Sequence, residues 1–511
     1  MATYLTPGVY VEEVDRGTKP IEGVGTAVAA FLGIAEKGPI GKATMIANWT
    51  QFTNVFGGYI PGAYLAHAVF AYFNNGGGLC YIVRLGAEDT GAAPAQPVAE
   101  IKAKGGAATI KALPKPGVST EGLSVEVTGG DDDSFNLTVK GGGAEEKYEG
   151  LVFGRGAKNA FDVVNKQSTL VQLEEVKVAG LSAAERAPAP GTYPLALPSA
   201  TTTAVVPVTP SDYEGDVTDR SGLGGLEAVN EITMVLAPDV MAAHQAGVID
   251  MDGVKAIQLA MIAHCERMGD RVAILDTPPN LNAQQAQDWR MNVAGYDSKY
   301  AALYYPWVTV ADPTPGAAAT TITVPPSGHL AGVWARNDNE RGVHKAPANE
   351  VLRGVISLPI NLTNAEQSVL NPNGVNCLRV FAGRGIRVWG ARTLSSDPSW
   401  RYLNVRRLFN FVEKSIEQGT QWAVFEPNDD MLWGKIRRDV GAFLRVVWRS
   451  GALFGATPDQ AFFVKCDAEN NPQETRDLGQ LYVDIGIAPV KPAEFVIFRI
   501  GQMASGGGVE E

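Results

Sequence analysis

The sequence predicts a mixed α/β protein of several domains, with buried strands and amphipathic helices in its core. In residues 23–86 and 221–325, short apolar runs alternate with helical patterns, which is typical of a sheet covered by helices. Residues 87–220 instead carry short strands between Gly- and Pro-rich loops. With 511 residues, 45% of them hydrophobic and 19% charged, the chain is long enough for more than one sizeable core.

Residues 1–22 are predicted to form an arm outside the core. Pro7-Gly8 predicts a turn, and a weakly alternating strand follows it. This strand comprises Val9, Tyr10, Val11, Glu12, Glu13 and Val14. A terminal strand on a tether either frays in solvent or adds to a sheet edge in another molecule. The segment lacks the basic start and apolar middle of a secretion signal, so none is expected.

Residues 23–86 are predicted to form the first part of an inner core domain. Thr26–Ile34 and Leu79–Leu85 are nearly continuous apolar runs, as buried strands are. Between them, Thr50–Phe56 and Tyr64–Phe73 have helical spacing, and glycines follow each of them.

Residues 87–220 are interpreted as a mostly β domain inserted at the outer surface. Its predicted strands lie near Leu123–Val127, Phe135–Val139 and Tyr148–Phe153. Because Gly- and Pro-rich stretches separate them, a partly disordered linker is the alternative.

Residues 221–325 repeat β and α units and predict a middle α/β domain with a parallel layer. The predicted strands are Ile232–Leu236, Val272–Leu275 and Leu303–Val310, and the predicted helices are Met251–Arg267 and Asn282–Asn292.

Residues 326–488 are predicted to form a C-terminal core domain with two amphipathic helices. The first has an apolar face made of Val405, Leu408, Phe409, Val412 and Ile416. The second is predicted to begin with Asn428 as its N-cap. A helix at Ser327–Ala335 and strands at Leu378–Phe381, Ile386–Trp389, Phe462–Cys466 and Gln480–Ile487 complete this segment.

Residues 489–511 are predicted to form a second arm. Its strand comprises Glu494, Phe495, Val496, Ile497, Phe498, Arg499 and Ile500, and the Gly-rich end after it is expected to fray.

Arginine is concentrated before and within the first amphipathic helix. Between Leu378 and Arg407 there are seven arginines against one acid, although the whole chain has a net charge of −12. Such a segment is either a solvated face or a docking surface for an acidic partner. The candidate contact residues are Arg401, Arg406, Arg407, Asn410 and Lys414.

No convincing catalytic, cofactor or metal constellation is found. The chain has neither a phosphate loop nor an H-E-x-x-H motif, and Asp276 at a strand end is more simply a turn cap than a catalytic group. His264 and Cys265 are adjacent on a predicted helix and point different ways, so no metal site is expected there. His67 lies beside apolar residues on another predicted helix and is interpreted as a hydrogen-bonded structural histidine. His344 and Lys345 lie in a polar loop.

Composition excludes several other functions. The acidic net charge argues against a general nucleic-acid binder, and no apolar run is long enough to predict membrane insertion. The four cysteines are far apart, which fits buried thiols in a protein made in a reducing cytoplasm.

Three stretches resemble signatures of one known family. The run GRGIRVWGARTLSSDPSWRYLNVRRLFNFVEKSIEQGTQWAVFEPND (residues 383–429) is similar to the C-terminal hallmark of contractile tail sheath proteins. That family covers phage tails, pyocin-type particles and phage-like contractile injection systems. TPGVYVEEVDRG (residues 6–17) and GVHKAPAN (residues 342–349) resemble its other signatures. The resemblance covers residues 1–86 and about 222–500, and residues 87–220 resemble the family's variable outer insertion.

The resemblance implies a structural subunit that needs no cofactor. Such subunits polymerise as stacked six-fold rings around an inner tube, on a baseplate and below a terminal cap, and contract to drive the tube forward. The two arms would join neighbours by strand addition, and the arginine-rich helix would face the tube. Assembly would take place in the bacterial cytoplasm, in a particle that stays there, is released or belongs to a virion. The alternatives are a dehydrogenase-like enzyme with a nucleotide site in residues 221–325, and a static shell or surface-layer protein.

Overall fold

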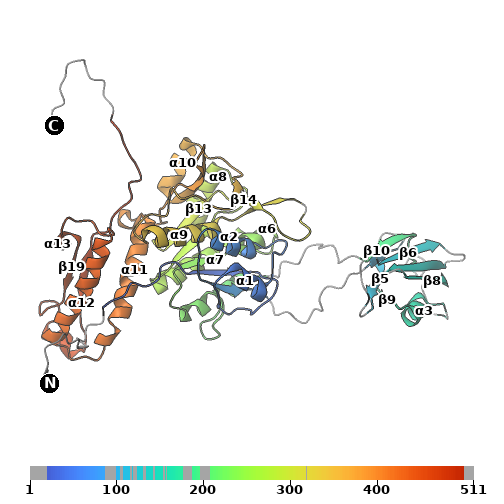
Figure 1. The fold of residues 1–511 in the computed structure, drawn as a ribbon, viewed down its shortest axis with the longest axis horizontal. Coiled ribbons are helices and arrows are strands. Elements are labelled where there is room, and N and C mark those ends of the chain that lie inside the picture. The colour runs from blue at the N-terminus through green and yellow to red at the C-terminus, as the bar shows by residue number, and fades with distance from the viewer. Residues whose placement is uncertain are drawn as a thin grey trace, which may run out of the picture. The chain divides into compact units, whose positions relative to one another are not determined.

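The computed structural model describes residues 20–86, 99–103, 108–115, 118, 123–129, 134–141, 144–152, 156, 158–176, 187–195, 208–317 and 319–499. The chain forms two compact units, one made of Met1–Gly86 with Val205–Glu511 and the other of Ala87–Ala204 (Figure 1). Residues 205–220, which the sequence analysis assigned to the insertion, therefore belong to the first unit. The reason is the packing of the short helix α4 (Pro210–Glu214), because its Tyr213 side chain is buried in the core of that unit.

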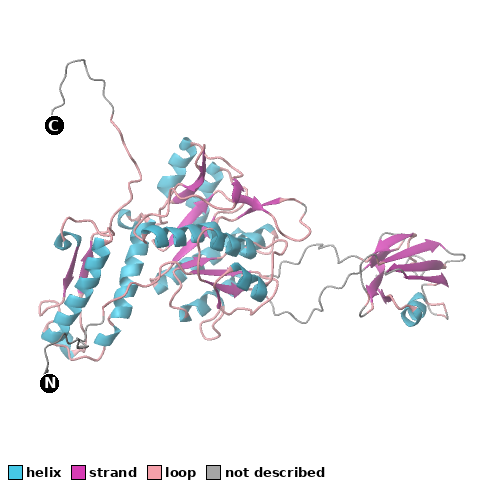
Figure 2. Ribbon diagram, viewed as in Figure 1, coloured by secondary structure: helices cyan, strands magenta, loops and turns pink. Residues whose placement is uncertain are grey.

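Among the described residues, an eight-stranded sheet forms the centre of the first unit (Figure 2). Its order is β18-β17-β13-β12-β11-β1-β3-β2, with parallel pairing except at the two edge strands, β2 and β18. The strands are β1 (Ala29–Gly33), β2 (Thr44–Ile46), β3 (Cys80–Arg84), β11 (Met234–Leu236), β12 (Val272–Asp276), β13 (Ala301–Tyr305), β17 (Val375–Phe381) and β18 (Gly385–Val388). All residues of β1, β3, β12 and β13 are buried, as expected for parallel strands covered on both faces.

This one sheet takes strands from three segments that the sequence analysis assigned to separate domains. Strands β1 to β3 come from residues 23–86, β11 to β13 from residues 221–325, and β17 and β18 from residues 326–488. Backbone pairing of β1 with β11 and of β13 with β17 joins the three segments. The structure therefore does not divide them into an inner and a middle domain.

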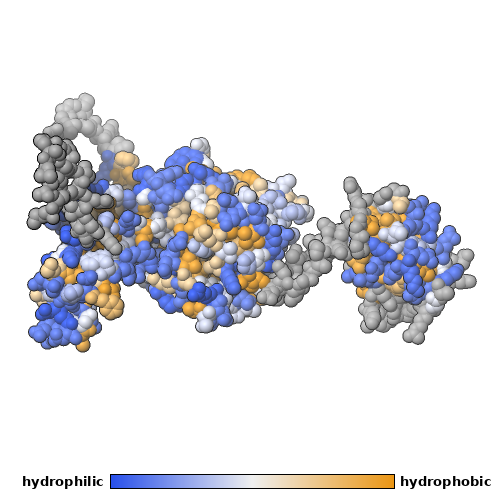
Figure 3. Space-filling view, turned by 60° about the horizontal axis from the view of Figure 1, so that its bottom comes forward, coloured by the Kyte–Doolittle hydropathy of each residue, from blue (hydrophilic) through white to orange (hydrophobic). Residues whose placement is uncertain are grey.

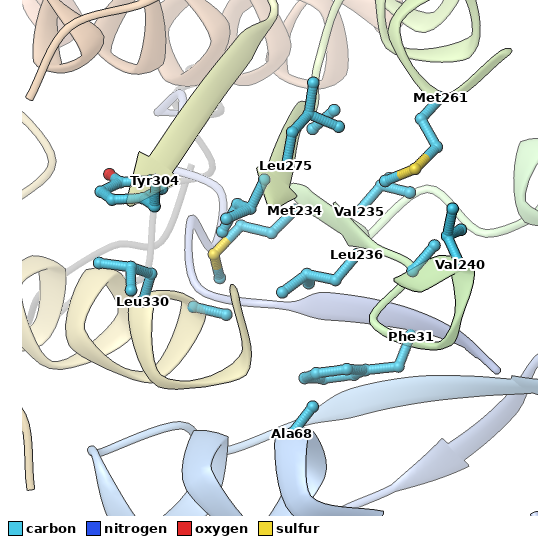
Figure 4. Packing of buried hydrophobic residues seen from close by; sticks show 14 of the residues in the cluster. Phe31, Ala68, Met234, Val235, Leu236, Val240, Met261, Leu275, Tyr304 and Leu330 are labelled. Carbon is cyan, nitrogen blue, oxygen red and sulfur yellow. The ribbon is translucent and has the colours of Figure 1, made fainter. Parts of the chain in front are cut away.

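Helices pack against this sheet and share its core. They are α1 (Trp49–Phe56), α2 (Leu65–Asn74), α5 (Gly222–Gly225), α6 (Asp239–Gln245), α7 (Met251–Met268), α8 (Ala283–Asp288), α9 (Ser327–Arg341) and α10 (Asn364–Leu370). Helices α2 and α9 approach each other closely, because a Cβ atom on Gly328 would lie 2.5 Å from the Cα atom of Ala68. Figure 4 shows Phe31 of β1 beside Ala68 and Tyr304 of β13 beside Leu330 of α9.

Two predicted elements of this unit differ in the structure. The single predicted strand Leu303–Val310 is divided at Pro306, which has no backbone N–H to donate, and β14 (Val308–Ala311) joins a separate antiparallel sheet with β15 (Thr321–Val324) and β16 (Val355–Ser357). The predicted helix Asn282–Asn292 becomes α8 followed by a π-helical turn, Trp289–Ala294.

The C-terminal helical region, residues 403–487, has a core of its own. It contains α11 (Leu403–Gly419), α12 (Asp430–Arg449), α13 (Pro458–Ala461), α14 (Gln473–Asp477) and the antiparallel pair β19 (Phe462–Lys465) and β20 (Asp484–Ile487). Both predicted amphipathic helices are confirmed. The N-cap of α12 is Asp429 rather than Asn428, because the Asp429 carboxylate accepts the Leu432 amide at 2.9 Å whereas Asn428 bonds to Trp433 and Gln480.

The second unit is mostly β. One sheet has the order β10-β6-β7-β8 and a second has β4-β5-β9, with α3 (Ala160–Gln167) beside β9. The strands are β4 (Ala99–Lys102), β5 (Ala108–Pro114), β6 (Ser124–Gly129), β7 (Phe135–Gly141), β8 (Ala144–Leu151), β9 (Val171–Glu175) and β10 (Gly191–Pro194). Strands β6, β7 and β8 lie at the three predicted positions. Nowhere in the described part of either unit is there a helix with the length and apolarity needed to cross a bilayer.

Candidate functional site

Buried ionisable groups in the sheet core have structural partners rather than a catalytic arrangement. Asp276 accepts a hydrogen bond from the Ser327 amide at 2.9 Å at the start of α9, and burial raises the pKa of its carboxyl to about 7. This carboxyl group therefore binds the first turn of a helix, whereas the sequence analysis expected it to cap a turn. Asp239 accepts the amides of Ile34 and Tyr64 in the same way, and burial raises its pKa to about 6.

The histidines singled out from the sequence are likewise packing residues. His67 packs against Tyr59 with the ring centroids 4.7 Å apart and the planes tilted by 53°, and burial lowers the pKa of His67. His264 lies 3.3 Å from Arg271, and burial lowers its pKa to about 4. Lys345 pairs with Glu350 at 2.7 Å. Within the described residues no group of three or more His, Cys, Asp or Glu side chains is placed to hold a metal ion.

The expectation that Arg406 and Arg407 lie on an exposed face of their helix is wrong. Both residues are buried, with 1% and 4% exposure, in the contact between α11 and the sheet. Arg406 stacks on Tyr300 and Trp400, at 4.7 and 4.5 Å from the ring centroids, and pairs with Glu413 at 2.8 Å. A helix that contacts a second body buries part of its polar face as well, and arginine suits such a site because its planar head stacks on aromatic rings.

Arg407 makes a bidentate ion pair with Asp338 of α9. The two distances are 2.5 and 2.9 Å, and both side chains are almost completely buried. The same guanidinium donates to the backbone oxygen of Thr26 at 3.0 Å and lies 4.8 Å from the Trp334 ring centroid. Arg407 therefore joins the helical region to the sheet and to the segment that leads into the N-terminal arm.

The other three candidate contact residues lie in different surroundings. Asn410 is buried and accepts from the Arg406 Nε atom at 2.6 Å, and Lys414 pairs with Asp270 at 3.2 Å. Arg401 is exposed. The structure thus leaves only one of the five candidates freely available to a partner.

An exposed basic face lies instead on α12, where sequence reasoning did not place it. We call Lys435, Arg438, Arg445 and Arg449 the basic stripe. These four residues are exposed and share one side of the helix, since their spacings are three, seven and four residues. The stripe extends over about 21 Å at the helical rise of 1.5 Å per residue. Its charge is only partly compensated, by Asp439 at 3.0 Å from Arg438. The sequence contains a signal for this exposed basic face, because the cations recur on the side of the predicted helix opposite its apolar residues.

The C-terminal arm is anchored at Glu494 and exposed beyond it. The Glu494 carboxylate accepts from Arg392 at 2.6 and 2.9 Å, from Asn371 at 2.8 Å and from Tyr402 at 3.3 Å. Burial by itself raises the pKa of this carboxyl, but the hydrogen bonds from Arg392 and Asn371 outweigh burial and lower the pKa.

Beyond this anchor the arm has no strand partner in the described chain. Residues 494–499 form no strand within the single chain, so their pairing with a neighbour stays a prediction, and Ile500 lies outside the described residues. Phe495, Val496, Ile497 and Phe498 are 72%, 68%, 79% and 83% exposed. Alternate residues of an extended chain point to opposite sides, so a strand made from this segment would be apolar on both faces. Such a segment is typical of an inner strand of a sheet.

The predicted N-terminal strand, Val9–Val14, lies outside the described residues. The described chain begins at Pro20. Its first residues lie along α11, where Ile21 is buried and the Val24 amide donates to Ser415 Oγ at 3.1 Å.

The sheet formed by β19 and β20 offers two open edges. Among the described residues each strand pairs only with the other, so the outer edge of each is unpaired. A hollow of about 380 Å³ lies beside β20, between Ile485, Ile487 and the α11 residues Phe409, Val412 and Ile416. Figure 3 shows apolar patches on this left-hand end of the molecule, amid mostly hydrophilic residues.

The comparisons with known proteins identify two sheath domains in this chain. The phage tail sheath protein central domain matches residues 228–394, and the phage tail sheath C-terminal domain matches residues 395–502. The tail sheath protein of Burkholderia phage BcepMu is 24% identical over 525 residues, which cover 98% of this chain and 97% of the relative. A putative prophage major tail sheath protein of Pseudomonas aeruginosa is 28% identical over 48% of this chain.

Several curated relatives match over only part of their length. The matched segment covers 61% of the Pseudomonas aeruginosa protein and 26% of the tail sheath protein of Vibrio phage KVP40.

Two solved structures match nearly the whole chain. The helical sheath of the anti-feeding prophage in its contracted state has a TM-score of 0.60 at 25% identity, with 98% of this chain and 100% of that chain covered. The sheath of an extracellular contractile injection system in its contracted state has a TM-score of 0.58 at 24% identity, covering 98% and 99%, and shares the fold. Together the two family domains span residues 228–502, more than half of the chain. The chain therefore belongs to the contractile tail sheath family, and it is a structural sheath protein rather than an enzyme.

Proposed function

We propose that this chain polymerises helically around an inner tube and contracts to drive that tube through a target envelope. The observation that carries the proposal is the exposed apolar arm, residues 495–498, next to a firmly held root at Glu494. Four exposed large apolar side chains contribute no hydrophobic stabilisation to a single folded chain, whereas a polymer can bury them between subunits. End-to-end similarity to a solved contracted sheath supports the same function.

The arms are proposed to join subunits by adding strands to the β19–β20 sheet of neighbours. In the described part of the chain that sheet has two open edges, and the sequence has two terminal segments with strand character, Val9–Val14 and Glu494–Ile500. A pairing of about four backbone hydrogen bonds at roughly 0.5–1.5 kcal/mol each would contribute about 2–6 kcal/mol per arm. Burial of the two apolar faces adds to this, so the joint would survive large movements of the subunit bodies.

The basic stripe on α12 is proposed to hold the inner tube. Arg406 and Arg407 cannot do so, because they are buried within the subunit. An exposed row of cations attracts an acidic tube surface, and each exposed pair is worth only about 0–1 kcal/mol. A contact built from several weak pairs holds in sum and still releases when the subunits move outward on contraction.

The remaining partners follow from the same proposal. The solved relatives include a baseplate of the anti-feeding prophage, so a baseplate is the expected starting point for polymerisation, and a terminal cap is expected at the other end. The Ala87–Ala204 unit is proposed to lie on the outer surface of the sleeve, because it is inserted between two parts of the first unit and has a hydrophobic core of its own. Synthesis and assembly are expected in the bacterial cytoplasm.

Electron microscopy of the purified assembly tests the proposal. Hollow sleeves in two forms, one long and narrow and one short and wide, are expected. A discrete oligomer would favour the enzyme alternative, and a flat lattice would favour a static shell.

The arms are tested by truncation. A chain that ends at Glu494 keeps the anchored root and loses the exposed segment, so it should remain folded and monomeric. Because Glu474 is exposed on α14, Glu474→Gln serves as a matched surface control that should assemble normally. Normal sleeves from the truncated chain would contradict the role of this arm.

A further inference from the structure

The roots of both terminal arms are held by the same helix, α11. We call residues 20–26 the N-arm root and residues 489–494 the C-arm root. The two roots are more than 460 residues apart in the sequence. Nevertheless each makes side-chain contacts with α11 or with the residue just before it. Other elements contribute too, since Thr26 Oγ1 donates to Asp338 of α9 and Glu494 is also bound by Arg392 and Asn371.

The N-arm root lies along the length of α11. Val24 donates its amide to Ser415 Oγ at 3.1 Å, and Thr26 accepts from Arg407 at 3.0 Å. The fit is close, because a Cβ atom on Gly23 would lie 2.8 Å from the Phe411 ring. This segment therefore cannot shift along the helix without breaking hydrogen bonds and contacts.

The C-arm root meets the first turn of the same helix. Asn404 donates to the backbone oxygen of Val490 at 3.1 Å, and Tyr402, the N-cap residue of α11, bonds to Glu494 at 3.3 Å. Arg392 closes the clamp on Glu494. Val490 also donates its amide to Ala452 at 3.2 Å, which ties the root to the end of α12.

The two sets of contacts meet within one helical turn. Asn404 holds the C-arm root and Arg407 the N-arm root, and residues three apart are neighbours on a helix surface. Both side chains are buried and each makes a second interaction. Asn404 also donates to the backbone oxygen of His344 at 2.8 Å, and Arg407 forms its ion pair with Asp338 at 2.5 Å. A displacement of α11 therefore affects both roots at once.

We propose that α11 couples the two arm roots, so that loosening one root loosens the other. The functional meaning rests on the proposed sheath function: a pull on the N-terminal arm of one subunit would reach its C-terminal arm, and hence the next subunit, through this helix. Tyr402, Asn404, Arg407 and Ser415 are the positioning residues of the coupling. The coupling itself is a property of the single folded chain.

Hydrogen exchange of the unassembled full-length chain tests the coupling. Glu494→Gln removes the charge from the clamp and keeps its shape, so opening of the C-arm root should increase about tenfold or more, as reported by the Val490 amide. If the roots are coupled, exchange of the Val24 amide should also rise, by about fivefold or more.

Thermodynamic linkage requires the reverse effect. Ser415→Ala removes the acceptor of the Val24 amide and should raise exchange of the Val490 amide. Glu474→Gln is the control and should change neither root. Unchanged exchange at Val24 in Glu494→Gln, or at Val490 in Ser415→Ala, would overturn the coupling, as would unchanged exchange at Val490 in Glu494→Gln.

Sleeves provide the second readout and separate the two proposals. Glu494→Gln leaves Val9–Val14, the apolar residues 495–498 and β19–β20 unaltered. Sleeves should therefore form, but a smaller fraction should contract after mild denaturant than in the parent. Contraction equal to the parent would overturn the mechanical role of the coupling. Failure of the parent chain to form any sleeve would instead overturn the proposed function and leave the exchange result intact.

Discussion

Loss of the Arg407 guanidinium should destabilise the chain strongly. In Arg407→Met the Asp338 carboxylate loses both bonds of its bidentate pair and keeps only the hydrogen bond from Thr26 Oγ1 at 2.6 Å. Both partners are almost fully buried, so the variant leaves an uncompensated charge in the interior. Removing one partner of such a pair typically costs about 3–5 kcal/mol. At about 1.4 kcal/mol per tenfold, the unfolding equilibrium should shift by more than a hundredfold.

Urea denaturation followed by tryptophan fluorescence measures this loss, because Trp334 contacts Arg407. The double variant Arg407→Met with Asp338→Leu replaces the whole pair by apolar groups and should recover most of the lost stability, since such replacements are often neutral. Arg401→Met is the matched control, because Arg401 is exposed and should change the free energy of unfolding by no more than about 0.5 kcal/mol. A single variant as stable as the parent, or a double variant no better than the single, would refute the assignment of Arg407 to an internal joint.

Three further predictions concern the tube contact, pH and the insertion. Reversal of Lys435, Arg445 and Arg449 to glutamate, with Arg438 kept because it pairs with the buried Asp439, should give folded subunits with an unchanged melting temperature that no longer form tube-filled sleeves. Tube-filled particles from this variant would exclude the stripe from the contact. Asp276 has a folded pKa of about 7, above its unfolded value. Its contribution to the free energy of unfolding is therefore fully present below the unfolded pKa and is lost as the pH rises toward 7. Asp276→Asn keeps an acceptor for the Ser327 amide but cannot titrate, so the free energy of unfolding should fall less between pH 4 and about 8 in urea titrations. An unchanged pH profile would contradict the raised pKa of Asp276. Deletion of residues 88–204 should leave a soluble, polymerising core, and an insoluble product from a soluble parent would count against the two-unit division.

The buried strands were predictable because parallel strands that are covered on both faces need apolar side chains at every position. Thr26–Ile34, Leu79–Leu85 and Val272–Leu275 satisfy this requirement and became β1, β3 and β12. The family was predictable from local signatures such as residues 383–429. Neither kind of signal depends on which distant segments meet.

The order of strands in the sheet was decided only by tertiary structure. Local patterns assigned residues 23–86 and 221–325 to separate domains, but β1 pairs with β11 across about 200 residues. Strands pair through backbone groups that nearly every residue has. A hydrophobic pattern therefore predicts that a segment is a strand but not which other strand it pairs with.

The candidate contact residues show the same limit at the level of side chains. Helical periodicity correctly placed Arg406 and Arg407 opposite the apolar stripe of α11, but it could not show that this side packs against Tyr300, Trp400 and Asp338. Exposure of an arginine depends on what the rest of the chain brings to it. The sequence alone therefore determined the two amphipathic helices α11 and α12 and the family, whereas contacts between distant segments decided which cations are internal joints and which, on α12, face outward.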